Sequence, residues 1–249
     1  MAKGGRNNLI AGENDVRSRP VYSIPEAAGY LGIPINTLVA WTVGRRKANS
    51  PNFYVPILSF VNPDLRKLSF YDLVEAQILR VAVERKVPLR QLKRGLAYLR
   101  SKHPLNPRPL LTYDFLTEGK YLLVGGMLGS KEKDQDALVN ASVHGQLEMA
   151  SVIGEHVSLL LSGIDESLKF VARDHGSKLP HTLFPKGGHH LVSITPGVVS
   201  GRPAIEGTRI PTRIIAQRFR AGEDAKTLAK DYRLSKEKIE AAIQYEAAA

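Results

Sequence analysis

The chain has 249 residues, with 35 Lys and Arg against 24 Asp and Glu, which gives a formal net charge of +11. Hydrophobic residues make up 43% of it, the balance of a soluble globular protein. Because there is no cysteine, disulfides, thiolate metal sites and cysteine nucleophiles are excluded. No apolar run approaches the roughly 20 residues that span a bilayer, and residues 1–20 lack the apolar core of a secretory signal. We therefore expect a soluble, cytoplasmic, membrane-free protein whose charge suits a polyanionic partner.

The N-terminal region begins with a Gly- and Asn-rich segment, residues 1–20, which predicts a flexible arm. Ser23-Ile24-Pro25-Glu26 then forms a capping box, in which a Ser and a Glu satisfy each other's backbone amides at a helix start. We expect this helix to end at Gly32 and a second helix to cover 34–42. Two short helices around a Gly-containing turn are typical of a helix-turn-helix.

The second of these helices carries candidate DNA contacts. If Leu38 and Trp41 face the core, short and polar side chains point outward, as on a recognition helix. Asn can pair with adenine, and Arg can read guanine or hold phosphate. The predicted DNA-binding residues of this region are Ser23, Asn36, Thr37, Ala40, Trp41, Arg45, Arg46 and Lys47. The alternative is a purely structural helix pair with a solvated basic end.

A β-hairpin, or wing, and two helices are predicted next. Two β-prone runs, Ile57–Val61 and Lys67–Phe70, flank a turn and predict the hairpin. Helical spacing predicts one helix from Tyr71 to Lys86, with Asp72 as its N-cap. A further helix covers Leu89–Leu99, where leucines spaced three or four apart form a seam.

The stretch from Arg85 to Tyr113 contains eight basic residues and no Asp or Glu. The eight are Arg85, Lys86, Arg90, Lys93, Arg94, Arg100, Lys102 and Arg108. Arg90, Lys93 and Arg94 lie opposite the leucine seam and are predicted DNA-binding residues. A charge run is usually a solvated face, but one without counter-charges suits DNA or an acidic protein.

After Arg108 the pattern predicts an α+β middle region and a helical C-terminus. Expected strands cover Leu110–Leu116, Lys120–Gly125, Leu168–Arg173, Thr182–Phe184 and His190–Ile194, with a long helix over 137–161. Expected C-terminal helices begin at Thr212, Ala225 and Ser235. The fold class is thus α+β and mainly helical, with a C-terminal three-helix, helix-turn-helix-like domain. Its predicted parts are an arm at 1–20, a winged helix-turn-helix at 21–107, a middle region at 108–193 and a helical domain at 194–249.

Two parts of the chain resemble known families. Tyr22–Trp41, with Arg66–Leu73 and Val87–Leu92, resembles the helix-turn-helix, wing and following helices of MerR-like regulators, although the cysteines of their metal sensors are absent. Pro196–Thr212 and Ala221–Ile243 resemble the domain-of-unknown-function family 433. Members of that family are commonly VapB-like antitoxins encoded beside a PIN-domain ribonuclease toxin.

The second resemblance implies a toxin partner and binding to operator DNA. A PIN-type site is a cluster of carboxylates around divalent metal, so an inserted Arg could compete there electrostatically. Arg202 and Arg209, which lie on turns flanked by Pro and Gly, are the toxin-binding candidates. The alternative is that they bond local backbone carbonyls. For the C-terminal helices as a whole we favour protein–protein packing.

Catalytic patterns are weak. His181, His189 and His190 are close in sequence, but adjacent strand residues point to opposite faces, so a shared metal is not expected. Gly125–Lys131 lacks the Gly-Lys-Ser/Thr ending of a phosphate loop. We expect no enzyme activity, no metal and no cofactor.

The leading hypothesis is a DNA-binding antitoxin that neutralises a PIN-domain toxin and represses its own operon as a homodimer. The leucine seam or the 137–161 helix is the expected dimer contact. The alternatives are a MerR-like regulator whose middle domain senses a ligand or protein, and an interaction scaffold that contacts only protein.

Overall fold

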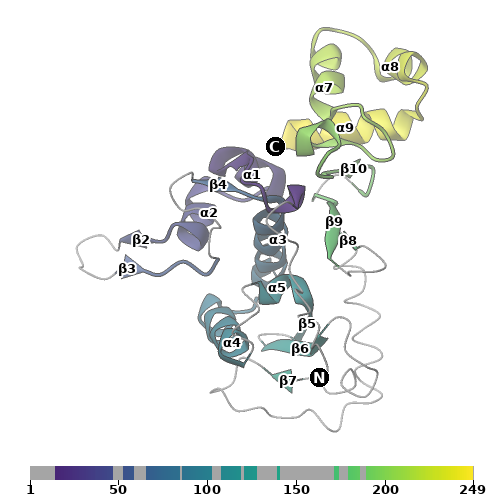
Figure 1. Ribbon diagram of the computed structural model, residues 1–249. Coiled ribbons are helices and arrows are strands. Elements are labelled where there is room, and N and C mark those ends of the chain that lie inside the picture. Colours follow the sequence, from purple (N-terminus) through teal and green to yellow (C-terminus); the bar gives the residue numbers. More distant parts are fainter. Residues whose placement is uncertain are drawn as a thin grey trace. The chain divides into compact units, whose positions relative to one another are not determined.

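The computed structural model of the protein describes residues 15–46, 53–58, 66–84, 86–102, 108–118, 121–127, 139–140, 171–173, 179–185 and 189–248 (Figure 1). The fold is α+β and mainly helical, as predicted. The described residues form two compact units. One joins residues 19–76 to 171–173 and 180–248, and the other holds the remainder. In these stretches no helix is long and apolar enough to cross a membrane.

The N-terminal helix pair forms as predicted. Helix α1, Ile24–Leu31, begins at a capping box in which the Ser23 hydroxyl accepts from the Glu26 amide at 3.4 Å and the Glu26 carboxylate accepts from the Ser23 amide at 3.0 Å. Gly32 ends it at φ +62°, a left-handed conformation that glycine adopts without steric cost. Helix α2, Ile35–Thr42, follows. Within the predicted arm, Val16–Ser18 form the short 3-10 helix η1, and residues 1–14 lie outside the described residues.

The predicted wing hairpin is wrong in its pairing. The run from Lys67 contains a strand as predicted, Ile57 and Leu58 do not form one, and residues 59–65 lie outside the described residues. Strand β2, Arg45–Arg46, pairs antiparallel with β3, Phe53–Tyr54, and β4, Lys67–Leu68, pairs with β1, Tyr22–Ser23. The amides of Ile57 and Leu58 both donate to the Trp41 carbonyl at 2.9 Å, and both side chains are buried. Ile57 and Leu58 are therefore part of a buried connection after β3 that bonds to the end of α2, and periodicity cannot distinguish such a segment from a strand.

Helices α3, Phe70–Glu84, and α4, Leu89–Lys102, match the predicted helices within two to three residues. The predicted cap of α3 is corrected. The Ser69 hydroxyl accepts from the Asp72 amide at 3.2 Å, while the Asp72 carboxylate accepts from the Ser69 amide at 2.7 Å. Ser69 is thus the cap, and Asp72 completes a second capping box.

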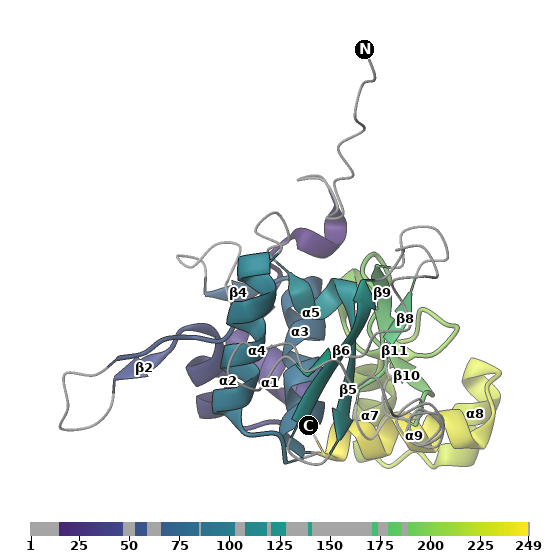
Figure 2. The same cartoon turned by 90° about the horizontal axis from the view of Figure 1, so that it is seen from below.

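The middle region contains one predicted hairpin. After the short helix α5, Pro109–Thr112, strand β5, Tyr113–Glu118, pairs antiparallel with β6, Tyr121–Met127 (Figure 2). Strand β7, Val139–Asn140, pairs with β6 and extends this sheet. The hairpin is confirmed, except that its expected beginning is helical. The predicted helix over 137–161 is wrong at β7, and the rest of that range lies outside the described residues.

Two short strand pairs lead into the C-terminal helices. Strand β8, Val171–Arg173, pairs with β9, Pro180–Leu183, and β10, Val192–Ser193, pairs with β11, Ala204–Ile205. The strand expected from His190 begins two residues later. The reason is that His189 and His190 have φ of +46° and +58°, outside the β region.

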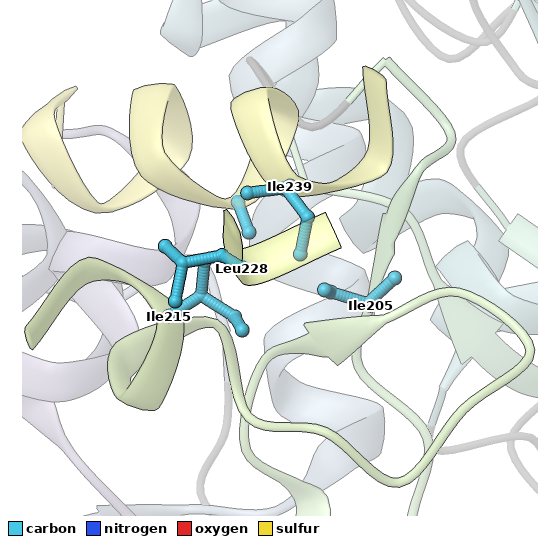
Figure 3. Close-up of a cluster of buried hydrophobic side chains, with 5 residues drawn as sticks. Ile205, Ile215, Leu228 and Ile239 are labelled. Atoms are coloured by element: carbon cyan, nitrogen blue, oxygen red, sulfur yellow. The ribbon is translucent and has the colours of Figure 1, made fainter. Parts of the chain in front are cut away.

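The C-terminal module comprises β10, β11 and three helices, α7 Thr212–Arg220, α8 Ala225–Tyr232 and α9 Lys236–Ala248. Its core gathers side chains from β11 and from all three helices, as Figure 3 shows. The buried residues of this core are Ile205, Ile215, Leu228, Ile239 and Ala242. Asp224 caps α8, and the Ser235 hydroxyl accepts from the Lys238 amide at 3.4 Å, as predicted for α9. Thr212 does not cap α7, because Pro211 occupies that position.

Candidate functional site

Helix α2 presents its first turn to solvent. Leu38 and Trp41 are buried, as predicted, while Asn36 is exposed and Thr37 and Ala40 are half-buried. The Asn36 amide group makes no hydrogen bond to the described residues, so its donor and acceptor are both available. Pro34 at the N-cap supplies no side-chain bond to the helix. The first turn of α2 therefore exposes a polar side chain, while Leu38 and Trp41 pack the helix against the core.

Two of the predicted DNA-binding residues, Ser23 and Trp41, stabilise the helix pair and do not point outward. The Ser23 hydroxyl donates to the Glu26 carboxylate at 2.6 Å, inside the capping box of α1. The Trp41 side chain is only 4% exposed, and its carbonyl holds the connection that follows β3. Both residues fix the helix pair, which positions the first turn of α2.

The predicted basic surface divides into several environments. The backbone of Arg45 and Arg46 forms β2, whereas their side chains and Lys47 lie outside the described residues. On α4, in the other compact unit, Arg90 and Arg94 are exposed and Lys93 is half-buried. Arg108 is buried, so it does not extend an exposed basic face. Arg90 and Arg94 are the clearest solvent-facing cations among the predicted contacts.

The leucine seam of α4 packs inside the chain. Leu92 and Leu96 are both about fully buried, Leu89 is exposed, and the side chain of Leu99 lies outside the described residues. Side chains that already fill their own core cannot also pack against a second copy. The expected use of this seam as a dimer contact is therefore unsupported at Leu92 and Leu96.

In the C-terminal module, Arg209 lies at the tip of a tight turn after β11, which we call the Arg209 turn, residues 205–210. The Ile205 amide donates to the Ile210 carbonyl at 2.9 Å, and the Thr208 hydroxyl donates to the Ile205 carbonyl at 2.8 Å. The same hydroxyl accepts from the Ile210 amide at 3.1 Å. These bonds hold the backbone on both sides of Arg209.

The base of the Arg209 turn is also tied to the rest of the module. The Glu206 amide donates to the Leu191 carbonyl at 2.8 Å, and the Lys238 ammonium donates to the Glu206 carbonyl at 3.0 Å. Gly207 adopts φ +74°, which allows the sharp reversal. The turn is thus a fixed platform, so little backbone entropy has to be lost when Arg209 meets a partner.

Arg202 and Arg209 are both exposed, and neither guanidinium forms a hydrogen bond or ion pair with any described residue. Other cations of the module do. Arg218 bonds Glu223 and Asp231 and stacks 5.3 Å from the Tyr232 ring, and hydrogen bonds to these groups raise its pKa. Local bonding to backbone carbonyls, the alternative reading of Arg202 and Arg209, is absent among the described residues.

Arg202 follows a strained turn. Val199, Ser200 and Gly201 have φ of +48°, +55° and +75° in succession, and a Cβ on Gly201 would overlap the Tyr22 hydroxyl. Arg202 lies near α1, since it is one of the charges that lower the Glu26 pKa, after the hydrogen bond from Ser23. Arg202 therefore has a carboxylate of its own chain nearby, that of Glu26.

Of the three histidines considered as metal ligands, His181 and His190 make separate local contacts. The His181 ring nitrogen Nδ1 is 2.9 Å from the Thr182 hydroxyl, and His190 stacks on Phe184 with ring centres 4.7 Å apart. Among the described residues no group of three His, Cys, Asp or Glu is arranged to hold a metal. The structure thus shows a local hydrogen bond for the His181 ring and packing for the His190 ring.

Sequence reasoning missed one outward residue of α2. Ile35 is 49% exposed at the first helical position, beside Asn36. An isoleucine in an amphipathic helix is normally placed in the core by its pattern, so the sequence carried no signal for this exposure. Ile35 lies on the same side of α2 as the buried Leu38, but it is exposed because it is at the first position of the helix.

The sequence is similar to a protein family and to proteins of known sequence. Residues 192–245 match the family described as Protein of unknown function (DUF433). The protein is 25% identical over 247 residues to Putative antitoxin VapB45 of Mycobacterium tuberculosis, covering 94% of this chain and 98% of that protein. It is 27% identical to Uncharacterized protein Rv2308 of the same organism, covering 91% and 90%.

A solved structure shares the fold. The crystal structure of Rv2018 from Mycobacterium tuberculosis superposes with a TM-score of 0.59 at 20% identity, covering 90% of this chain and 98% of that one. That match concerns the fold alone. The matched C-terminal family and the full-length similarity to VapB45 support an antitoxin-like protein.

Proposed function

We propose that this protein is a DNA-binding antitoxin that neutralises a PIN-domain ribonuclease and represses its own operon. The observation that carries the toxin part is the Arg209 turn, which presents an exposed guanidinium, unpaired among the described residues, on a hydrogen-bonded platform. The full-length similarity to Putative antitoxin VapB45 supports the general class. The protein acts by binding and carries out no chemistry.

Toxin neutralisation follows from the chemistry of a guanidinium. A PIN-type site holds divalent metal between carboxylates, and a guanidinium can bind two carboxylate oxygens through parallel N–H groups. Arg209 would take the place of the metal charge and exclude the RNA phosphate. Arg202 would add a second contact once it leaves the field of Glu26, which makes it the weaker of the two.

DNA binding is assigned to the first turn of α2. Asn36 would reach base edges, Thr37 and Ala40 would line the groove, and Arg45, Arg46 and Lys47 would hold phosphates. Ser23 and Trp41 would position the helix without touching DNA, because one is used in the capping box and the other is buried. Arg90, Lys93 and Arg94 would contribute phosphate contacts from α4. The protein would bind as a homodimer to two half-sites.

The toxin part is tested by co-expression with the product of the neighbouring reading frame, using a tag on that product. We expect the two proteins to co-purify. Replacing Arg209 by Ala should weaken the complex by about thirtyfold or more, the effect of removing a central interface Arg. Binding is measured by titration calorimetry with the purified partner.

The matched control is Arg220→Ala, which removes the same charge from the exposed end of α7, where Arg220 donates to the Glu246 carbonyl at 3.3 Å. This variant should bind the partner as the unmodified protein does. Equal losses in Arg209→Ala and Arg220→Ala would indicate a general charge effect. Failure of the unmodified pair to co-purify would remove the antitoxin assignment.

A further inference from the structure

The first turn of α2 exposes an apolar group beside an amide. Ile35 is 49% exposed at the first helical position, and Asn36 beside it is exposed and makes no hydrogen bond to the described residues. Pro34 before them is exposed as well. Single exposed hydrophobic residues are common and need no explanation by themselves. The pairing of an isoleucine with a free amide at the start of this helix is what distinguishes the position.

The packing behind α2 fixes which residues face outward. Leu38 is fully buried and Trp41 nearly so, and the Thr42 hydroxyl donates to the Leu38 carbonyl at 2.6 Å. Ile35 lies on the side of the helix that carries Leu38 and Thr42, but its place in the first turn leaves it 49% exposed. The cost of leaving Ile35 in water is therefore retained in the folded protein, and a partner that covers it regains this free energy.

The chemistry of this turn matches one base pair. In the major groove an A·T pair shows the adenine N6 donor and N7 acceptor together with the thymine C5-methyl group, and no other pair offers a methyl. An Asn amide satisfies the adenine edge, and an aliphatic side chain covers the methyl. Neighbouring residues on a helix point about 100° apart, so the two side chains meet bases of two neighbouring A·T pairs, which together form one A·T step.

We infer that Ile35 reads the C5-methyl group of a thymine while Asn36 reads an adenine in the same A·T step. This inference rests on the DNA-binding part of the proposed function. It assigns to Ile35 a specificity role that neither its residue type nor its place in the helical pattern indicates. The α2 turn then recognises a step through one apolar and one polar contact.

The test uses thymine and uracil, which differ only in that methyl group. The fragment upstream of the coding sequence is amplified with either dTTP or dUTP, and binding of the full-length protein to each is measured by fluorescence anisotropy. Covering one methyl corresponds to about a fourfold difference in affinity. We expect the unmodified protein to prefer thymine DNA by about that factor, and Ile35→Ala to bind both DNAs equally.

The matched control is Ile214→Ala, which shortens another exposed isoleucine, 37% exposed on α7. It should keep the preference for thymine. Asn36→Ala should also keep that preference but lose discrimination against DNA containing 7-deazaadenine, which lacks the N7 acceptor. Circular dichroism of each variant checks that α2 is intact, and Ala is a better helix former than Ile.

The outcomes separate the inference from the proposed function. Equal binding of both DNAs by the unmodified protein overturns the methyl contact while DNA binding stands. A thymine preference that persists in Ile35→Ala assigns the methyl to another residue and also overturns it. Loss of toxin co-purification by Ile35→Ala with unchanged DNA affinities makes Ile35 a protein contact. Absence of binding to either DNA overturns the DNA-binding function together with this inference.

Discussion

At the scale of single residues, the turn before Arg202 stores conformational strain. Val199 and Ser200 lie in the left-handed region, which costs about 1–3 kcal/mol for a residue that is not glycine. The Gly201 amide donates to the Val198 carbonyl at 2.8 Å, and the Arg202 amide donates to the Val199 carbonyl at 3.1 Å. These bonds, with the buried Tyr22 ring against Gly201, hold the backbone in place.

We predict that Gly201→Ala lowers the free energy of unfolding by about 1–3 kcal/mol. The added Cβ meets the Tyr22 hydroxyl, and φ of +75° is unfavourable for alanine. Gly197→Ala is the matched control, because Gly197 has φ +83° and no atom within 4 Å of the added carbon. Urea denaturation followed by circular dichroism gives both values. A loss no larger in Gly201→Ala than in Gly197→Ala would show that contact with Tyr22 contributes nothing.

At the scale of elements, α1 depends on its capping box. The Ser23 hydroxyl is the main cause of the lowered pKa of Glu26, followed by the opposing effect of burial and then by the Ser23 amide, Arg202 and Lys67. A carboxylate whose pKa is lower in the folded state stabilises the fold above its unfolded pKa. That contribution is lost as the pH falls through the folded pKa.

We predict that Ser23→Ala costs about 0.5–2 kcal/mol of stability at neutral pH, the usual effect of losing a serine cap. The difference from the unmodified protein should shrink in acid, once Glu26 is protonated in both. Urea denaturation at neutral pH and again below the folded pKa of Glu26 measures this. Glu26→Gln is the control, since it keeps the side chain but removes the charge and so flattens the acid dependence. A constant difference at all pH values would mean that Glu26 has no part in the cap.

At the scale of the whole molecule, the net charge of +11 is spread over both compact units. Arg90 and Arg94 are exposed on α4 in one unit, and the first turn of α2 lies in the other. If both regions meet one DNA, each phosphate contact releases counterions and adds to the salt dependence of binding. The number of such contacts therefore reports whether both units take part.

We predict that Arg90→Ala and Arg94→Ala each weaken binding to all DNA sequences alike and reduce the slope of log affinity against log salt by about one. The slope is measured by fluorescence anisotropy over a series of salt concentrations. Lys236→Ala is the control, because Lys236 is 3.2 Å from the Glu240 carboxylate on α9 and is already compensated. Unchanged slopes in both arginine variants would confine DNA binding to the unit that contains α2.

Features whose physical causes lie within a few residues could be predicted from the amino-acid sequence. The capping box of α1 and the caps of α8 and α9 follow from side chains that bond neighbouring backbone, and Gly32 adopts its left-handed conformation because it has no Cβ. The β5–β6 hairpin follows from two β-prone runs around a short turn. The C-terminal resemblance belongs here too, since its turn glycines and helix starts are local. These features established the α+β class and pointed to an antitoxin-like protein.

Strand pairing and the exposure of side chains depend on contacts between distant parts of the chain. Strand β4 pairs with β1 and not with its neighbour, because partners distant in sequence compete for each backbone edge. Burial of Arg108 and exposure of Ile35 depend on what packs behind them, which no local pattern encodes. The same holds for Arg209, whose lack of any partner among the described residues is set by where the charges of other elements lie.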